Sequence, residues 1–281
     1  MKSELEVDIY EQAITTKFRQ LLWSRFLKAI HEFKLISEGD KICVCISGGK
    51  DSMIMAKMFM CLQKFMNFKF EVKYLVMNPG YNSLNLEMIK KNLKTLNIPA
   101  EIHETNIFEI ANAQDKSPCF LCAKMRRGAL YNIAKSMGCN KIALGHHYDD
   151  VIETTLMNML SSGSFQTMLP KLHSTNYEGM ELIRPLYYIR EKDIIRFSKE
   201  FNLNFIQCAC RFTESYTHSE DGIGESRRRY IKNLIKEIKK EIPDVEKNLF
   251  SSANNVTFDM ILGYKVNSVY HSYLENYDDD K

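Results

Sequence analysis

The sequence predicts an α/β fold with a doubly wound, mainly parallel sheet of five strands and helical additions at both ends. Short apolar runs alternate along the chain with amphipathic segments of helical length, the pattern of parallel strands joined by right-handed crossovers. Two glycines, Gly48 and Gly49, separate the first apolar run from the first long helix, where doubly wound folds bind ligands. The 281 residues suffice for one such core, because single cores stop growing near ~250–300 residues.

The individual elements follow from local patterns. Apolar residues at helical spacing predict a helix over residues 8–36. Strands are predicted from the runs KICVCIS, FEVKYLVMN, EIHETNI and KIALGHH, which begin at residues 41, 70, 101 and 141. Helices are predicted from the glycine pair to about residue 65, from the turn at Pro79 and Gly80 through residue 96, and over residues 119–137, 149–160, 190–203 and 225–241.

This order of elements divides the chain into four expected regions. Residues 1–36 form an N-terminal helical extension, and residues 37–165 form the α/β core. Residues 166–265 form an α-rich appendage packed on that core. Residues 266–281, which end in NYDDDK, are expected to be a disordered acidic tail.

The composition narrows the class of protein. Hydrophobic residues make up 45% of the chain and charged residues 26%, and charges interrupt the long apolar stretches, so no membrane span is expected. The first residues, MKSELEVDIYEQ, lack the continuous apolar segment of a signal peptide, which predicts a cytoplasmic protein. In that compartment eight cysteines point to metal binding or catalysis and not to disulfides. The net charge of +3 is too small to indicate nucleic-acid binding by itself.

A glycine-containing loop after the first strand is the main candidate for nucleotide binding. The hexapeptide SGGKDS consists of Ser47, Gly48, Gly49, Lys50, Asp51 and Ser52. Adjacent glycines let the backbone approach a ligand closely, and the amides that follow can form an anion-binding nest at a helix start. We expect Lys50 to neutralise phosphate oxygens and Asp51 to hold Mg²⁺ beside a polyphosphate that is split between its α and β groups. The alternative is an ordinary Gly-Gly turn in which Asp51 caps the helix.

A second candidate sequence, GHHYDD, follows a later strand. The carboxyl ends of parallel strands share one edge of the sheet, so Gly145 and His146 are expected to lie near the glycine loop, as is Asn78 at the end of the second strand. His146 and His147 are expected to contact phosphate or move protons. Asp149 and Asp150 either share metal binding or cap the next helix.

The third candidate site contains cysteines. Cys119 and Cys122 form a CxxC sequence at a predicted helix start, where neighbouring cations and the helix dipole favour thiolates. A CAC sequence far along the chain, Cys208 and Cys210, is the expected partner. The spacing alone is compatible with zinc, iron–sulfur or redox chemistry. The remaining cysteines lie in apolar segments and are interpreted as core residues: Cys43, Cys45, Cys61 and Cys139.

Taken together, these sequences resemble a known family. Ser-Gly-Gly-X-Asp-Ser after a first strand is the signature of the PP-loop ATP pyrophosphatases, and within them the chain is similar to the tRNA 2-thiocytidine synthetase group (TtcA). The similarity runs from about Tyr10 to Val256 through EGDKICVCISGGKDS, CFLCAKMRRGALY, KIALGHHYDDVIETTLMNML, IRPLYYIREKDI and FSSANNV. The resemblance implies an adenine nucleotide alpha hydrolase-like, Rossmann-like core and adenylation of a substrate oxygen by ATP with Mg²⁺. It also implies that Gly145, His146, Asp149 and Asp150 lie beside ATP.

The resemblance further implies a [4Fe-4S] cluster held by three cysteines, with one iron free to carry sulfur. Cys119 and Cys122 match two of the ligands, and Cys208 matches the third. The family has a second CxxC at this point whereas this chain has CxC, so Cys210 is an alternate third ligand. The connection over residues 211–226 is longer than is usual in the family. A four-cysteine structural zinc site remains the alternative.

Two basic runs are candidate contacts for tRNA phosphates. Arg126 and Arg127 follow the first cysteine pair, and a late helix begins with Arg227, Arg228 and Arg229. Guanidinium groups pair with phosphate in a fork geometry. The alternative for the late run is a solvated helix face, since glutamates are interleaved with its lysines.

The function predicted from this resemblance is ATP-dependent tRNA thiolation. The C2 oxygen of a tRNA pyrimidine, with cytidine 32 as the expected target, attacks the α-phosphate of ATP, and sulfur then displaces AMP. The expected sulfur donor is a cysteine desulfurase persulfide or sulfide, and the family suggests a homodimer. The alternatives are thiolation of another nucleoside to give 2-thiouridine, a ligase like lysidine synthetase, or a non-enzymatic nucleotide and iron–sulfur sensor.

Overall fold

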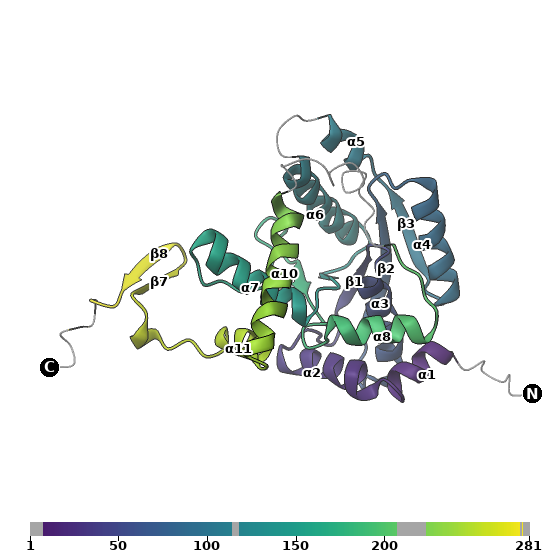
Figure 1. The fold of residues 1–281 in the computed structure, drawn as a ribbon. Helices are drawn as coiled ribbons and strands as arrows, with labels where there is room; N and C mark the ends of the chain where they lie inside the picture. The colour runs from purple at the N-terminus through teal and green to yellow at the C-terminus, as the bar shows by residue number, and fades with distance from the viewer. Residues whose placement is uncertain (1–7, 114–117, 207–222, 276, 278–281) are drawn as a thin grey trace, which may run out of the picture. The chain divides into compact units, whose positions relative to one another are not determined.

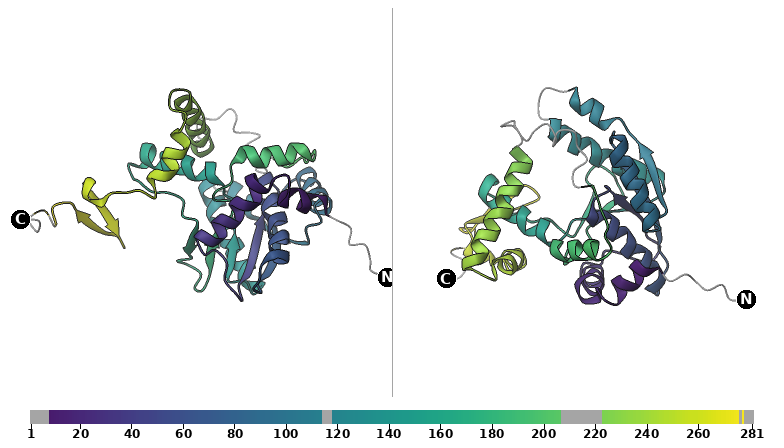
Figure 2. Two further views of the ribbon diagram at one scale, coloured as in Figure 1. Left: turned by 90° about the horizontal axis from the view of Figure 1, so that it is seen from below. Right: turned by 45° about the vertical axis from the view of Figure 1, so that its right-hand side comes forward.

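The computed structural model describes residues 8–113, 118–206, 223–275 and 277 (Figures 1 and 2). A six-stranded sheet lies at its centre, in the order β3-β2-β1-β4-β6-β5. Five neighbouring strands are parallel, and β5 pairs antiparallel with β6 at one edge. The strands are β1 (Lys41–Ile46), β2 (Glu71–Asn78), β3 (Ala100–Glu104), β4 (Lys141–Ala143), β5 (Lys171–His173) and β6 (Glu181–Ile183).

The predicted α/β architecture is confirmed, with one strand more than the five expected. The two strands that were not located in the sequence are β5 and β6, which form a pair of three-residue strands. Strands this short do not leave a clear period-two pattern in the sequence. The helices that connect the parallel strands are α3 (Lys50–Phe65), α4 (Ser83–Thr95), α5 (Ile107–Asn112) and α6 (Pro118–Ser136).

Both faces of the sheet are buried. Cys43 and Cys45 of β1 pack in one cluster with Tyr131 and Ala134 of α6. Side chains alternate along a strand, so the intervening Val44 points to the opposite face, and it is buried as well. Burial of consecutive residues explains why KICVCIS is a continuous apolar run. The interpretation of the four cysteines outside the two motifs as core residues is confirmed, since all four are buried.

The N-terminal extension is broken into three pieces where the sequence predicted one helix. They are α1 (Ile9–Thr15), the π-helical turn η1 (Arg19–Trp23) and α2 (Ser24–Glu32). At the break, the Thr16 hydroxyl donates to the Gln12 carbonyl over 2.7 Å, and the Phe18 amide donates to the Ala13 carbonyl over 2.8 Å. Threonine hydroxyls that bond back to the preceding turn bend helices, and the Phe18 bond is a π-type bond.

A buried ion pair attaches α1 to α3. Lys57, whose side chain is completely buried, places its Nζ 2.5 Å from Asp8 Oδ2 and 3.2 Å from Glu11 Oε1. Asp8 also caps α1 by accepting from the amides of Tyr10 and Glu11. The lysine in the middle of an apolar helix therefore has a structural partner and is not part of the candidate sites.

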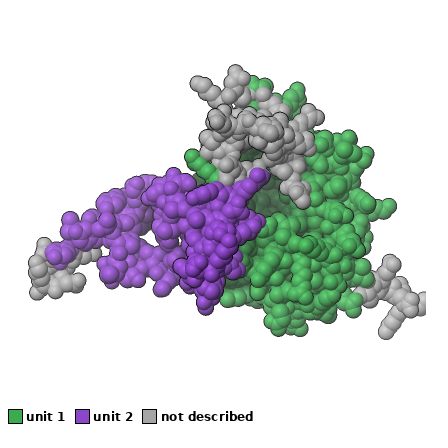
Figure 3. Space-filling model, viewed as in Figure 1, with its two compact units in different colours: residues 1–151, 168–227 green, residues 152–167, 228–281 purple. Residues whose placement is uncertain are grey.

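The chain divides into two compact units (Figure 3). One comprises Met1–Val151 and Met168–Arg227 and holds the whole sheet, with α8 (Glu191–Glu200). The other comprises Ile152–Thr167 and Arg228–Lys281. Helix α7 (Tyr148–Ser162) and helix α10 (Ile223–Glu241) each begin in the first unit and continue into the second. The second unit also contains α11 (Val245–Ser252), η3 (Phe258–Met260), β7 (Gly263–Val266) and β8 (Val269–Ser272).

The β7–β8 hairpin corrects one expectation. Residues 266–281 were predicted to be a disordered tail, but the chain pairs Val266 with Val269 and Gly263 with Ser272. The alternation of apolar and aromatic side chains here favours a strand, while the acidic composition that suggested disorder is confined to the last residues. Among the described residues, no helix combines the length and the apolar character needed to cross a membrane.

Candidate functional site

The two polar loops predicted to meet do so at the point where the sheet reverses its strand order. The chain runs outward from β1 through β2 to β3 and then returns to place β4 on the other side of β1. Residues 47–52 follow β1, and residues 145–150 follow β4, its parallel neighbour. Ligands bind at such switch points, outside the carboxyl ends of the strands.

The backbone of the first loop requires its glycines. Gly48 has a φ of +87°, and a Cβ atom there would lie 2.6 Å from Ile206 Cδ1 and 2.7 Å from Ile89 Cγ1. The two serines close the loop: Ser52 Oγ accepts from the Ser47 amide over 3.1 Å and donates to the Gly49 carbonyl over 3.0 Å. The serines therefore shape the loop rather than point freely at a ligand.

The start of α3 is open to an anion. Its N-cap residue is Gly49, which has no side chain to accept from the first amides of the helix. Unpaired amides and the helix dipole make such an N-terminus a binding site for phosphate. Lys50, the first residue of α3, adds a positive charge at the same place.

Asp51 provides a carboxylate suited to a cation. Its Oδ1 atom is buried and has no hydrogen-bond partner, and His147 Nε2 lies 3.8 Å from it. Burial raises the pKa of Asp51, although His147 and Lys50 act in the opposite direction. An orphaned buried oxygen of this kind fits a Mg²⁺ ligand, because Mg²⁺ is commonly held by one or two carboxylates together with substrate phosphates.

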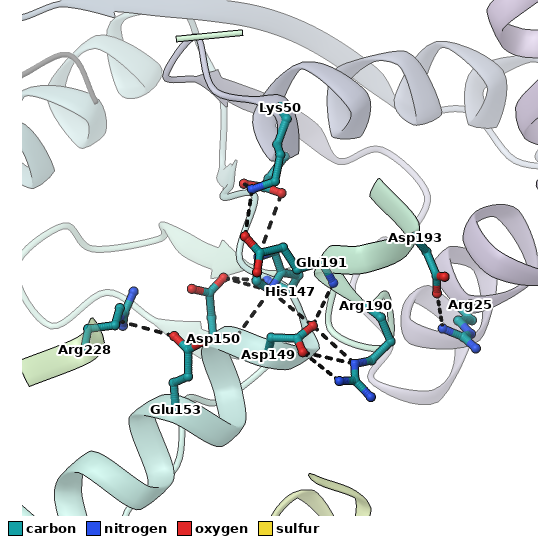
Figure 4. Close-up of polar contacts among 11 residues, drawn as sticks. Arg25, Lys50, His147, Asp149, Asp150, Glu153, Arg190, Glu191, Asp193 and Arg228 are labelled. Carbon is teal, nitrogen blue, oxygen red and sulfur yellow. Dashed lines mark hydrogen bonds and ion pairs between the residues drawn. The ribbon is translucent and has the colours of Figure 1, made fainter. Parts of the chain in front are cut away.

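Lys50 lies between two carboxylates from distant parts of the sequence. Its Nζ is 3.2 Å from Asp51 Oδ2 and 3.1 Å from Oε1 of Glu191, the first residue of α8 (Figure 4). Burial alone would lower the pKa of Lys50, but the charges of Asp51 and Glu191 outweigh it and raise the pKa. The lysine is therefore a firmly protonated group at the mouth of the loop.

The second loop is held by its own acidic residues (Figure 4). Asp150 Oδ2 accepts from the His147 amide over 3.0 Å, and the Asp150 amide donates to His147 Nδ1 over 3.3 Å. Asp149 Oδ1 receives Arg190 Nη2 over 2.8 Å, and its Oδ2 accepts from the Glu191 amide over 2.7 Å. Asp150 thus caps its own helix, whereas Asp149 fixes the start of α8.

One cavity joins the nucleotide loop to the helix that carries the CxxC sequence. It has a volume of about 340 Å³, and Asp51 and Arg126 both line it. Its walls come from both loops, the strand ends and α6: Cys45, Ile46, Ser47, Ser52, Met77, Ala123, Arg127, Leu130, Ile142, Leu144, Gly145 and His146. Cys122 is buried directly before Ala123. The CxxC helix and the nucleotide loop therefore border the same cavity, as the mechanism requires.

A second cavity opens on the other side of Asp51. It has a volume of about 530 Å³ and is lined by Lys50, Glu191 and Lys199, with Asn204 and residues 205–206 beyond them. Asp51 lines both cavities, of which one has mainly apolar walls and the other is lined by several charged side chains.

The remaining predicted residues lie in several places. Asn78 is buried, and its side chain supports a turn: Oδ1 accepts from the amides of Gly80 and Tyr81, and Nδ2 donates to Glu104. Its nucleotide contact stays a prediction. Cys208 and Cys210 lie outside the described residues, as does the side chain of Cys119.

The late arginines belong to α10. Arg227 and Arg229 are exposed, while Arg228 is half-buried with its Nε 3.9 Å from Glu153 Oε2. Their contact with RNA stays a prediction. Within the described part of the chain, no group of three or more His, Cys, Asp or Glu side chains is arranged to hold a metal ion.

Sequence reasoning did not assign Arg190 and Glu191 to the site. Both Arg190 and Glu191 lie in the REKDI sequence that had been noted only as part of a resemblance. A run of charges directly before an amphipathic helix was the available signal. What could not be seen is that α8 packs on α3 and brings Glu191 to Lys50.

Comparison with known proteins identifies the family. A family model described as the PP-loop domain matches residues 14–219. The tRNA-cytidine(32) 2-sulfurtransferase of Citrifermentans bemidjiense is 34% identical over 252 residues, covering 88% of this chain and 93% of that protein. The protein of the same name from Geotalea daltonii is 35% identical over 237 residues, covering 83% and 90%.

A solved structure is similar in fold. The U34-tRNA thiolase NcsA from Methanococcus maripaludis, with its [4Fe-4S] cluster, matches with a TM-score of 0.64 and 19% identity, covering 83% of this chain and 77% of that chain. The predicted PP-loop architecture is thereby confirmed. From the matching domain and the two relatives together, the chain belongs to the PP-loop family, in the group of the tRNA-cytidine(32) 2-sulfurtransferases.

Proposed function

We propose that the protein uses ATP to replace the C2 oxygen of a tRNA cytidine with sulfur, giving 2-thiocytidine at position 32. The single observation that carries this proposal is the cavity lined by both Asp51 and the CxxC helix α6. A ligase would use the loop but has no need of cysteines beside it, and a nucleotide and iron–sulfur sensor would bind ATP without releasing pyrophosphate. The names of the relatives, all tRNA-cytidine(32) 2-sulfurtransferases among those described above, support the same substrate.

The protein's own residues bind and orient ATP. The open amides at the start of α3 receive phosphate oxygens, and Lys50 balances their charge. Asp51, with its orphaned oxygen, would hold Mg²⁺, which supplies charge neutralisation at the departing pyrophosphate. The apolar part of the 340 Å³ cavity accommodates the nucleoside part of ATP.

Adenylation is then a matter of position and electrostatics. The C2 oxygen of the cytidine attacks the α-phosphorus, the bond to the β-phosphate breaks, and pyrophosphate leaves. Arg126, which lines the same cavity as Asp51, would stabilise charge on the α-phosphate oxygens. His146 at the same wall is placed to exchange a proton with the nucleoside.

The second step exchanges oxygen for sulfur. A sulfur nucleophile attacks C2, and AMP departs with the former C2 oxygen. A [4Fe-4S] cluster held by Cys119, Cys122 and either Cys208 or Cys210 would supply an iron position at which sulfur is carried. Cys122 is buried and directly precedes Ala123, which lines the cavity, so a ligand on this side of the sheet fits. The cluster of NcsA supports the same cofactor.

The remaining partners complete the proposal. Arg127 and the arginines 227–229 contact tRNA phosphates, and the sulfur comes from a cysteine desulfurase persulfide or from sulfide. The protein acts in the cytoplasm as a homodimer. A structural zinc site formed by the four motif cysteines is the competing assignment for the metal.

The proposal is tested by anaerobic purification followed by reconstitution. The protein is analysed for iron and acid-labile sulfide, then incubated with tRNA, ATP, Mg²⁺ and sulfide, and nucleosides are measured by mass spectrometry. We expect 2-thiocytidine only when all components are present, and none with the Cys122→Ser variant. A colourless protein with stoichiometric zinc would exclude the cluster, and thiolation by Cys122→Ser would exclude the role of the CxxC helix.

A further inference from the structure

Lys50 has two acidic partners, and only one of them belongs to the nucleotide loop. Asp51 is its neighbour in sequence, while Glu191 comes from the first turn of α8. The side chains of all three residues are about a quarter exposed, at 26%, 24% and 21% for Lys50, Asp51 and Glu191. At this burial the two ion pairs are only partly screened by solvent.

The backbone of Glu191 is fixed independently of Lys50. Its amide donates to Asp149 Oδ2 over 2.7 Å, and Asp149 is held in turn by the guanidinium of Arg190. Helix α8 also packs on α3, and its buried Phe197 contacts Phe18 of the N-terminal extension. The position of the Glu191 carboxylate beside Lys50 is therefore fixed by the packing of α8.

The second ion pair of Lys50 matters because a lysine and a metal ion compete for the carboxylate of Asp51. An ammonium paired with Asp51 alone would neutralise the carboxylate and compete with a cation for it. In the structure, Lys50 contacts Oδ2 of Asp51 and shares its charge with Glu191, so Oδ1 keeps no hydrogen-bond partner.

We propose that Glu191 is a positioning residue that holds Lys50 away from the metal-binding face of Asp51. In the ATP-free protein, Lys50 bridges the two carboxylates. When MgATP binds, Asp51 coordinates Mg²⁺ and the Lys50 ammonium contacts phosphate oxygens. The ion pair with Glu191 then keeps Lys50 at the loop. This inference rests on the proposed binding of MgATP at residues 47–52.

The test is ATP binding to the full-length protein by equilibrium dialysis over a series of Mg²⁺ concentrations. In Glu191→Gln the ammonium has Asp51 as its remaining partner, so we expect the Mg²⁺ concentration for half-maximal binding to rise roughly tenfold. The matched control is Glu200→Gln, the same charge change on the same helix, whose carboxylate pairs with Lys17. The control is expected to match the native protein, and Glu191→Asp is expected to recover part of the loss.

A mutant cycle separates positioning from direct metal binding. In a Lys50→Gln background there is no ammonium to hold, so adding Glu191→Gln should leave the Mg²⁺ dependence almost unchanged. An equal, tenfold effect in that background would show that Glu191 acts at the metal itself and would overturn the inference. So would Glu191→Gln behaving like Glu200→Gln while native protein binds MgATP. A native protein that binds no MgATP would instead refute the proposed function on which the inference rests.

Discussion

At Asp51, the requirements of stability and of function are opposed. Burial raises the pKa of this carboxyl, with His147 and Lys50 only partly opposing the effect. The ordinary pKa of an aspartate is 3.8, and burial places the folded-state pKa of Asp51 above it. The protein therefore loses stability as the pH rises from the unfolded-state pKa through the folded-state pKa, because the unfolded state gives up its proton first. At neutral pH the ionised side chain therefore lowers the free energy of unfolding, which is expected of a group kept for a ligand.

Asp51→Asn should stabilise the protein and inactivate it. Asparagine keeps the shape of the side chain but removes the buried charge, so we expect the midpoint of thermal unfolding to rise by a few degrees. Pyrophosphate release in the presence of ATP, Mg²⁺ and tRNA should fall at least roughly a hundredfold. Calorimetry and a pyrophosphate assay measure the two effects. A lower midpoint combined with retained pyrophosphate release would contradict the account of this residue.

At the scale of elements, the attachment of α1 to α3 depends on a single buried ammonium. Lys57→Met leaves Asp8 without its partner, and loss of one member of a buried ion pair should lower the free energy of unfolding by about 3–5 kcal/mol. Lys64→Met is the matched control. Like Lys57, Lys64 lies on α3 and pairs with Glu11 of α1, but its side chain is 61% exposed. The control should lose less than about 1 kcal/mol. Denaturant titrations give both values, and equal losses would disprove the role of burial.

The contact between the two loops makes a second prediction about elements. A Cβ atom on Gly145 would lie 3.0 Å from the Ser52 amide nitrogen and 3.2 Å from the carbonyl carbon of Asp51, so Gly145→Ala must displace the start of α3. We expect ATP affinity to fall roughly tenfold to a hundredfold. Gly128→Ala, in the helix α6, meets only the Tyr177 hydroxyl at 3.4 Å and should bind ATP normally. Unchanged ATP affinity in Gly145→Ala would mean that ATP does not bind at the edge of the sheet where the two loops meet.

The two aspartates of GHHYDD show where sequence reasoning about an element succeeds and where it fails. Asp150 lies in the first turn of α7 and caps it by accepting from the His147 amide, which is a local relation and was one of the predicted alternatives. Asp149 instead fixes α8, which begins 42 residues later. Such a bond depends on which helices pack together, and no residue near Asp149 signals it. Glu191 escaped prediction for the same reason.

For the whole molecule, buried cations outside the site set the acid limit of stability. Burial alone would raise the pKa values of Asp8, Asp40 and Glu181, but Lys57 and Lys141 outweigh it and lower all three. Carboxyls with a lowered folded pKa contribute fully above their unfolded values, 3.8 for aspartate and 4.5 for glutamate, and lose that contribution as the pH falls further.

We therefore expect the midpoint of thermal unfolding to fall steeply below about pH 4.5 and to change little just above it. Calorimetry across this range provides the measurement. In Lys57→Met the acid-induced fall should be shallower, because Asp8 then has a less depressed pKa. A midpoint that is insensitive to pH below 4.5 would contradict the assignment of these ion pairs.

The overall architecture and the common edge of the sheet could be predicted because they follow from strand order. SGGKDS and GHHYDD each come directly after a strand, and parallel strands bring such loops together. The sequence could not reveal that α6 covers the same edge, since a helix can pack on either face of a sheet. The position of Ala123 and Arg126 in the cavity wall is what the structure adds.

The central claim is that the nucleotide loop and the CxxC helix serve one reaction. Its most direct test is the ratio of AMP released to 2-thiocytidine formed, measured by chromatography and mass spectrometry in one anaerobic reaction. We predict one AMP for each thionucleoside in the native protein. In Cys122→Ser we predict pyrophosphate release without thionucleoside, with AMP appearing only as water hydrolyses the adenylated cytidine back to cytidine. Thiolation that proceeds without AMP formation would contradict the account.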